Sequence, residues 1–217
     1  MDSLNVLYFV EDRAQEQFLT ALVERIALDL SIPRQSFAHD VRSARRGSGV
    51  VTEFRDFARH LRKMGNLEAD MIVVAVDANC RGYAKKEKEL AGCLQRSDLF
   101  RDSLVFAIPD PHIERWYVLD QGALIAAVGL ARGIAPPPYK CKRDYYKSIL
   151  RDALWQQGVN SLLGGSEFGA DIAHNMSDLY TAGTRDQSFA RFVDDVKKVL
   201  RQAYHTTLHR QDVEPLI

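Results

Sequence analysis

The sequence predicts an α/β fold, in which a mostly parallel four-stranded sheet is flanked by helices and followed by a helical C-terminal extension. The first indication is an unbroken apolar run at residues 71–76, which is typical of a strand buried on both faces of a parallel sheet. The second is that strand patterns and helix patterns alternate along residues 4–132. The third is that only helical patterns follow residue 133.

Four segments are expected to be strands, and each is followed by a helical pattern. The strands are Leu4–Val10, Ser36–Val41, Met71–Val76 and Leu104–Ile108. In the helix after the first strand, apolar residues recur every four positions from Phe18 to Leu30. After the fourth strand, Asp110 and Pro111 have the residue types of an N-cap and a first helical position. Strands separated by helices in this way form parallel sheets with right-handed crossovers.

A change of character near residue 133 divides the chain into two parts. Ile134–Tyr139 contains three prolines and is expected to be a stiff loop. Beyond it, Phe189, Phe192 and Val196 share one face of a long helix. We therefore expect an α/β core over residues 1–132 and a helical extension over residues 133–217 that packs on this core.

The overall composition excludes some classes of partner. The chain has 29 Lys and Arg residues against 29 Asp and Glu residues, so it is not a protein that coats DNA through bulk positive charge. No apolar run is long enough to cross a membrane. The three cysteines are odd in number and lack Cys-x-x-Cys spacing, so we expect reduced thiols and a cytoplasmic protein.

Acidic and amide side chains follow three of the predicted strands. Glu11 follows the first strand, Asp77 and Asn79 follow the third, and Asp110 and Glu114 follow the fourth. In a parallel sheet these strand ends lie at one edge, which is where α/β proteins bind their ligands. Clustered oxygen ligands of this kind suit Mg²⁺ or Mn²⁺. Such a cation can activate water and neutralise the charge on a phosphodiester under attack.

A structural role is the alternative for each of these residues. An acid after a strand is often a turn residue or a helix cap, and capping is favoured for Asp110. For Asp77 the functional interpretation is favoured, because a buried apolar run would not end in an Asp-x-Asn step without a reason. For Glu11 the two interpretations weigh equally, and Glu114 would by default be an exposed surface glutamate.

Three stretches carry a resemblance to a known family. Val10–Asp12 and Val76–Asn79 resemble the Toprim pattern, which has a glutamate after the first strand and Asp-x-Asp after the third. Ala107–Asp120, which reads Ala-Ile-Pro-Asp-Pro-His-Ile-Glu-Arg-Trp-Tyr-Val-Leu-Asp, is similar to the Pro-x-Ile-Glu-x-Trp signature of small standalone Toprim-like proteins. The resemblance covers most of the chain and implies a Toprim/Rossmann-like sheet.

The resemblance also assigns roles to individual residues. It implies metal binding by Glu11, Asp77 and Asn79, with Glu114 as a further acid at the site. It implies a nuclease that depends on Mg²⁺ (or Mn²⁺) and hydrolyses DNA or RNA. Proteins of this kind occur beside ATPases in bacterial defence or mobile-element modules, which implies an antiphage or toxin-type effector controlled by an ABC-type ATPase partner. A homo-oligomer is left open.

Two positions depart from the family pattern. The family usually reads Glu-Gly-x-Thr-Glu after the first strand, whereas here Gln15 stands at the second glutamate, and Asn79 replaces an aspartate. An amide oxygen can ligate Mg²⁺ but adds no charge. The alternative is therefore a catalytically degenerate Toprim-fold protein that serves as a binding or regulatory subunit without nuclease activity.

Three pairs of basic residues are candidates for contacts with nucleic acid. They are Arg45 and Arg46, Lys85 and Lys86, and Lys142 and Lys147. The first pair lies in a glycine-containing loop that could hold phosphate, and the second begins the helix after the third strand. The third pair stands near Tyr139, Tyr145 and Tyr146, a mixture suited to a single-stranded or RNA substrate. A solvated surface is the alternative for each pair.

Overall fold

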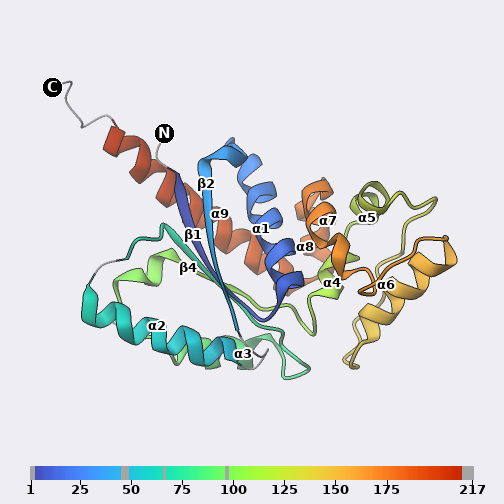
Figure 1. Ribbon diagram of the computed structural model, residues 1–217, viewed down its shortest axis with the longest axis horizontal. Helices are drawn as coiled ribbons and strands as arrows, with labels where there is room; N and C mark the ends of the chain where they lie inside the picture. Colours follow the sequence, from blue (N-terminus) through green and yellow to red (C-terminus); the bar gives the residue numbers. More distant parts are fainter. Residues whose placement is uncertain (1–2, 45–48, 66, 96–97, 212–217) are drawn as a thin grey trace.

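A four-stranded parallel sheet organises the structure. The computed structural model describes residues 3–44, 49–65, 67–95 and 98–211. Within these residues the strands are β1 (Leu4–Val10), β2 (Phe37–Ser43), β3 (Met71–Ala75) and β4 (Leu104–Ala107). They are arranged in the order β2-β1-β3-β4, and every pairing is parallel (Figure 1). The predicted α/β class and four-stranded sheet are therefore confirmed.

Helices follow each strand and make up the C-terminal extension. They are α1 (Arg13–Leu28), α2 (Val50–Met64), α3 (Tyr83–Ala91), α4 (Glu114–Tyr117), α5 (Gln121–Val128), α6 (Tyr145–Gln156), α7 (Gly169–Asn175), α8 (Leu179–Arg185) and α9 (Gln187–Gln211). Short 3₁₀ turns are η1 (Arg34–Ser36), η3 (Leu99–Ser103) and η4 (Ser166–Phe168). In the described part of the chain, none of these helices has the length and apolar character needed to span a bilayer.

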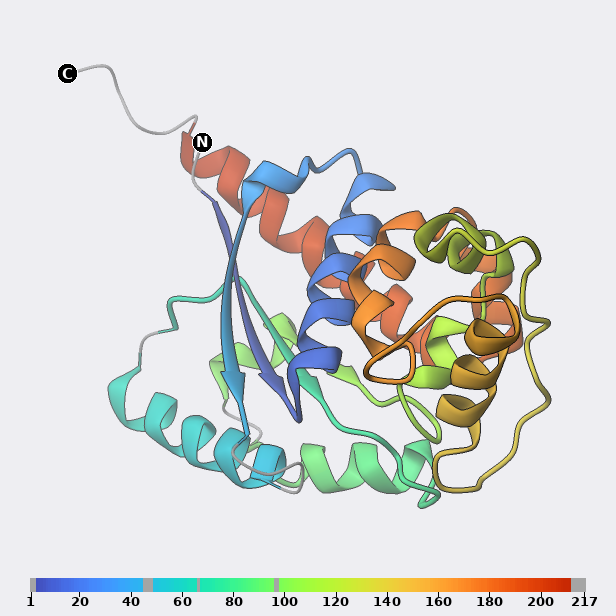
Figure 2. The same cartoon turned by 45° about the vertical axis from the view of Figure 1, so that its right-hand side comes forward.

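Helices cover both faces of the sheet, so alternate strand residues enter different cores. In β1, Tyr8 packs in the core formed with α1 and α9, whereas Phe9 packs in the core formed with α2. In β3, Val73 packs in the first of these cores and Val74 packs in the second. Figures 1 and 2 show α1 and α9 on one face of the sheet and α2 and α3 on the other. Burial on both sides explains why the apolar sequences of β1 and β3 do not alternate with polar residues.

The C-terminal extension packs on the sheet through one shared hydrophobic core. Trp116 of α4 lies 5.4 Å, between ring centroids, from both Phe189 and Phe192 of α9. Arg115 donates hydrogen bonds to Asp186 and to the hydroxyl oxygen of Tyr146. The boundary proposed between residues 132 and 133 stays a prediction, and the core runs across it.

The segment after β4 differs from the prediction. Asp110 does not cap a helix, because α4 begins only at Glu114 and Ile113 holds its N-cap position. The Asp110 carboxylate instead accepts a hydrogen bond from the hydroxyl group of Tyr139, 3.0 Å away. The backbone N–H groups of Ala78 and Asn79 donate to the carbonyls of Pro109 and Pro111. These bonds hold the segment beside the loop after β3, so it cannot coil into a helix there.

Candidate functional site

A cavity of about 680 Å³ opens at the carboxyl ends of the strands. Its lining includes five residues that the sequence singled out, namely Glu11, Asp77, Asn79, Glu114 and Lys147. Three of them follow β1 and β3, one begins α4, and the last lies on α6. The parallel topology therefore brings distant acidic residues to one place, as predicted.

Gln15 connects the ends of β1 and β3. It is buried in the first turn of α1, whose N-cap Asp12 accepts a hydrogen bond from the Gln15 backbone N–H. Its Oε1 accepts from the backbone N–H of Glu11 at 3.0 Å, and its Nε2 donates to Oδ1 of Asp77 at 3.2 Å. A glutamate at this position could not donate to Asp77. The amide at position 15 is therefore a clamp between the two strand ends.

Asp77 is held in place by several donors. Its side chain is 14% exposed and accepts from Gln15 and from the backbone N–H of Ile113. Nδ1 of His112 lies 3.3 Å from Oδ2 of Asp77. Nε2 of His112 is buried and has no hydrogen-bond partner among the described residues. The Nδ1 contact of this imidazole therefore helps to fix the orientation of Asp77.

The loop after β3 is joined to the C-terminal extension by a disulfide bond. Asn79 and Cys80 both have left-handed backbone conformations, with φ values of 49° and 63°. Nδ2 of Asn79 donates to the carbonyl of Asp77, and Cys80 is bonded to Cys141 across 61 positions of sequence. The prediction of three reduced thiols is therefore wrong for this pair, whereas Cys93 is free and buried. No spacing motif marks two cysteines that only tertiary packing brings together.

Glu114 is not the exposed surface glutamate that composition alone would suggest. It is partly buried in the first turn of α4 and lines the cavity. Burial raises the pKa of its carboxyl group, and the charge of Lys147 offsets a small part of this rise. The acid and the lysine line the same cavity.

Ionisation of the acids in this cavity is disfavoured. Burial, with the charges of Asp77 and Asp12, raises the pKa of Glu11 to about 8. Burial also raises the pKa of Asp77, and the hydrogen bond that His112 donates to the Asp77 carboxylate raises the pKa of His112. Burial is the largest cause for both acids, and the neighbouring carboxylates add to it for Glu11. A positively charged ligand beside these acids would favour their ionised forms.

The donor chemistry of the cavity fits a hard divalent cation. Glu11 and Asp77 supply carboxylate oxygens, and Asn79 supplies an amide oxygen. Over the residues that the structure describes, no three His, Cys, Asp or Glu side chains already form a metal-binding group. Mg²⁺, however, is usually held by one or two carboxylates and keeps several waters. The residues present meet that requirement.

The predicted basic residues do not all reach the cavity. Lys147 lines it, whereas Lys142 is exposed and does not. Lys86 pairs with Glu89 at 3.0 Å, and its charge lowers the pKa of Glu11 without lining the site. Lys85 is exposed on α3. Arg45 and Arg46 lie outside the described residues.

Six further residues line the cavity and were not among the predicted site residues. They are Asp12, Cys80, His112, Arg143, Asp144 and Tyr146. His112 stands two positions before Glu114 in the Pro-x-Ile-Glu-x-Trp stretch, and this closeness is the one signal that could have drawn attention to it. Arg143 belongs to the segment that the disulfide bond holds next to the loop after β3. Its place at the site follows from tertiary structure alone.

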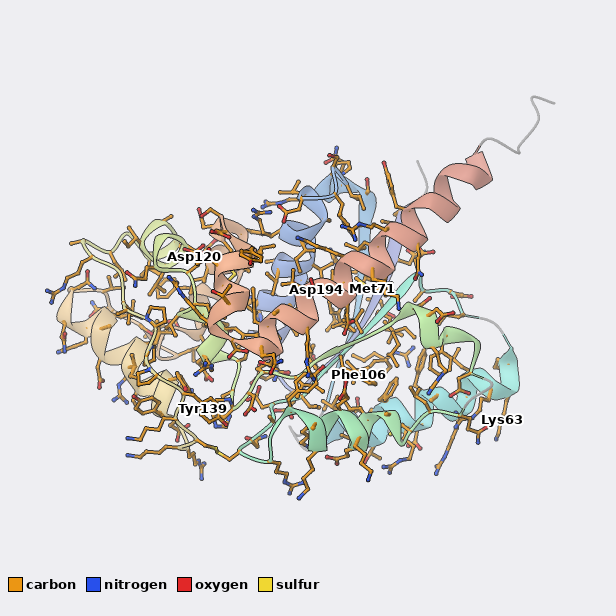
Figure 3. All side chains as sticks on the ribbon, turned by 180° about the vertical axis from the view of Figure 1, so that it is seen from behind. Lys63, Met71, Phe106, Asp120, Tyr139 and Asp194 are labelled. Atoms are coloured by element: carbon orange, nitrogen blue, oxygen red, sulfur yellow. A yellow bond between two sulfur atoms is a disulfide. The ribbon has the colours of Figure 1, made fainter. Side chains whose placement is uncertain are left out.

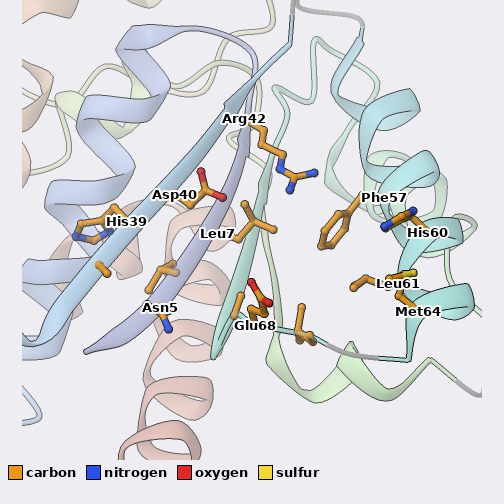
Figure 4. Close-up of a pocket in the computed structure, with 14 residues that line it drawn as sticks. Asn5, Leu7, His39, Asp40, Arg42, Phe57, His60, Leu61, Met64 and Glu68 are labelled. Atoms are coloured by element: carbon orange, nitrogen blue, oxygen red, sulfur yellow. The ribbon is translucent and has the colours of Figure 1, made fainter. Parts of the chain in front are cut away.

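A second cavity, of about 530 Å³, lies between β1, β2 and α2 (Figure 4). Arg42 reaches into it from β2, and its guanidinium carbon lies 5.0 Å from the centre of the Phe57 ring. Asp40 and His60 add single polar groups from different elements. This cavity follows the side of the strands instead of their carboxyl ends. The strand-end cavity is therefore the better candidate for an active site.

Comparison of the chain with protein-family models, with curated proteins and with solved structures found no match. The Toprim resemblance accordingly remains an expectation drawn from the residues at the strand ends. A function for this chain has to be inferred from the chemistry of the cavity itself.

Proposed function

We propose that this protein is a nuclease that depends on Mg²⁺ (or Mn²⁺) and hydrolyses phosphodiester bonds of DNA or RNA in the strand-end cavity. The observation that supports this most is that acids from three separate segments, Glu11, Asp77 and Glu114, line one cavity together with Lys147 and Arg143. Acids suit a divalent cation, and basic residues beside them suit the phosphate on which it acts.

In this proposal, some residues of the cavity would bind the cation and others would position its ligands. Glu11, Asp77 and Asn79 would hold the cation, which when bound would activate water and neutralise charge on the phosphate. Gln15 and His112 keep the Asp77 carboxylate in one orientation through their hydrogen bonds. Positioned groups of this kind lower the cost of reorganisation during a reaction.

Lys147 and Arg143 would attract the phosphate of the substrate. Both residues line the same cavity as Glu11 and Asp77. A phosphate drawn to them would therefore lie in the cavity that would hold the cation. This arrangement would bring the scissile bond near the cation.

The Toprim resemblance supports a biological setting for this activity. The nuclease would be the effector of an antiphage or toxin-type module and would be controlled by an ABC-type ATPase partner.

The test is a cleavage assay on labelled DNA and RNA, with and without Mg²⁺ or Mn²⁺. We expect metal-dependent cleavage that falls by roughly 100-fold or more in Glu11→Gln and in Asp77→Asn, since each removes a charge at the proposed metal site. Asp102→Asn is the matched control, because Asp102 is exposed in η3 at the opposite end of β4. Metal-dependent cleavage that survives both site substitutions would contradict the proposal.

A second candidate function is a degenerate Toprim-fold subunit that binds a partner without cutting. The amide groups of Gln15 and Asn79 favour it, because they remove two charges that the family places near its metal. In the structure both amides are engaged in hydrogen bonds with Asp77. This function predicts that the cavity binds no divalent cation, which separates it from the nuclease.

A further inference from the structure

We infer that the outer face of α6 is a track for single-stranded nucleic acid that leads into the strand-end cavity. On this face Lys147 and Arg151 would contact phosphates, and Trp155 would stack on an unpaired base. The inference rests on the proposed nuclease activity and names its substrate class. The inference adds a binding surface on α6 that extends outward from the basic residues of the cavity.

The three residues lie on one side of the helix. Lys147, Arg151 and Trp155 are spaced by four positions, which places them on neighbouring turns. At about 1.5 Å per residue they span about 12 Å, the length of three or four stacked nucleotides at about 3.4 Å each. Lys147 is at the inner end because it lines the cavity. Figures 1 and 2 show α6 at the outer edge of the molecule.

Trp155 is an unusual residue to leave in solvent. Its side chain is 75% exposed, whereas the other tryptophan, Trp116, is fully buried. An exposed aromatic ring beside positive charge is a platform on which bases stack, and stacking tolerates any base. In a duplex the faces of the bases are already stacked on each other. A lone indole therefore favours a single strand over a duplex.

A glycine loop lies against this face and adds apolar surface. A Cβ on Gly164, which has φ +72°, would lie 3.3 Å from Cε of Lys147 and 3.9 Å from Cβ of Arg151. The two residues before it, Leu162 and Leu163, are 97% and 60% exposed. Sugar rings and bases can pack on such side chains. The loop thus forms one border of the track.

The charges on the track are available to a phosphate. Arg151 pairs with the adjacent Asp152 at 2.8 Å, and both side chains are largely exposed. Exposed ion pairs of this kind contribute little to stability. A phosphate can therefore replace the Asp152 carboxylate as the partner of Arg151. Lys140, Lys142 and Arg143 are also exposed just before α6. This run of positive charge complements a phosphate backbone.

The aromatic residues predicted for this role are less suited to it. Tyr146 is buried, and its hydroxyl group is bonded to Arg115 and to the backbone N–H of Lys140. Tyr139, labelled in Figure 3, is exposed but its hydroxyl group donates to Asp110. The Trp155 side chain makes no such hydrogen bond in the described structure. It replaces Tyr146 as the stacking residue.

The test measures binding without cleavage, by fluorescence anisotropy of labelled oligonucleotides in EDTA. We expect the single strand to bind more tightly than the duplex of the same sequence. Trp155→Ala should weaken single-strand binding by about 5- to 150-fold, which is the range for loss of one stacked base, and Trp155→Phe should retain most of it. Arg151→Ala should reduce the salt dependence of binding by about 0.7 in the logarithmic slope.

Tyr180→Ala is the control, because Tyr180 is another exposed aromatic residue, on α8, and should not affect binding. Equal binding by wild type and Trp155→Ala, or preference for the duplex, would overturn the inference. The nuclease proposal is judged separately. If the protein cleaves nucleic acid but Trp155→Ala does not weaken binding, only the track on α6 is contradicted. If binding depends on Trp155 but no cleavage occurs, only the nuclease proposal is contradicted.

Discussion

Gln15 shows why the role of a single side chain can be opposite to what its residue type suggests. In the sequence it stands where a glutamate is expected, so it looks like a lost metal ligand. In the structure its amide accepts from the backbone of Glu11 and donates to Asp77. Only a side chain with both a donor and an acceptor can do this. The residue type at position 15 shows that a carboxylate charge is missing. Only the structure shows that the Gln15 amide joins Glu11 and Asp77 through hydrogen bonds.

Glu11 provides a prediction about pH at the same scale. In the metal-free protein its pKa is about 8 against an ordinary value of 4.5, so ionising it opposes folding. The unfolded chain binds fewer protons between these values, and stability should therefore fall as pH rises from about 4.5 to 8. The loss is on the order of a few kcal/mol. In EDTA, Glu11→Gln should melt at a higher temperature than wild type at pH 8.

The matched measurement is the same comparison near pH 4.5, where wild-type Glu11 keeps its proton. The advantage of Glu11→Gln should shrink there, because both side chains are then neutral. Asp102→Asn should show no comparable gain at pH 8, since Asp102 is exposed and far from the cavity. A variant that is equally or less stable than wild type at pH 8 would contradict the environment described for Glu11.

Whole elements were easier to predict than the connections between them. The bounds of β1 agree with the prediction residue for residue, because its apolar run ends abruptly at Glu11. The strand β2 was placed too short, since it continues through Arg42 and Ser43 as an edge strand with polar side chains. The helix after β4 was placed too early, because hydrogen bonds from the loop after β3 hold residues 109–111 in a bend that is not helical. Tertiary contacts of this kind leave no periodic signal.

The disulfide bond between Cys80 and Cys141 gives a prediction at the scale of the elements it joins. Alkylation of the unfolded but unreduced protein should label Cys93 alone, and reduction should expose all three thiols. Closing a loop of 61 positions is worth about 4 kcal/mol in the chain-entropy model. Cys141→Ser should therefore lower the melting temperature. Mass spectrometry that finds three labelled cysteines without reduction would contradict the bond.

At the scale of the whole molecule, the parallel sheet makes the candidate site predictable. Glu11 and Asp77 are 66 positions apart in sequence, yet the topology places both strand ends at one edge. The sequence could not show that the extension brings Lys147 and Arg143 into the same cavity as the acids at the strand ends. Nor could it show that His112 turns toward Asp77. These features depend on how α4, α6 and α9 pack together, which no local pattern records.

The central claim is that Glu11 and Asp77 hold one divalent cation between them. The most direct measurement is a titration with Mn²⁺ followed by electron paramagnetic resonance, with Mg²⁺ as competitor. We predict that wild type and Asp102→Asn bind Mn²⁺ in a way that Mg²⁺ displaces, and that Glu11→Gln and Asp77→Asn lose this binding. Wild type that binds no Mn²⁺, or site variants that bind it as well as wild type, would contradict the claim.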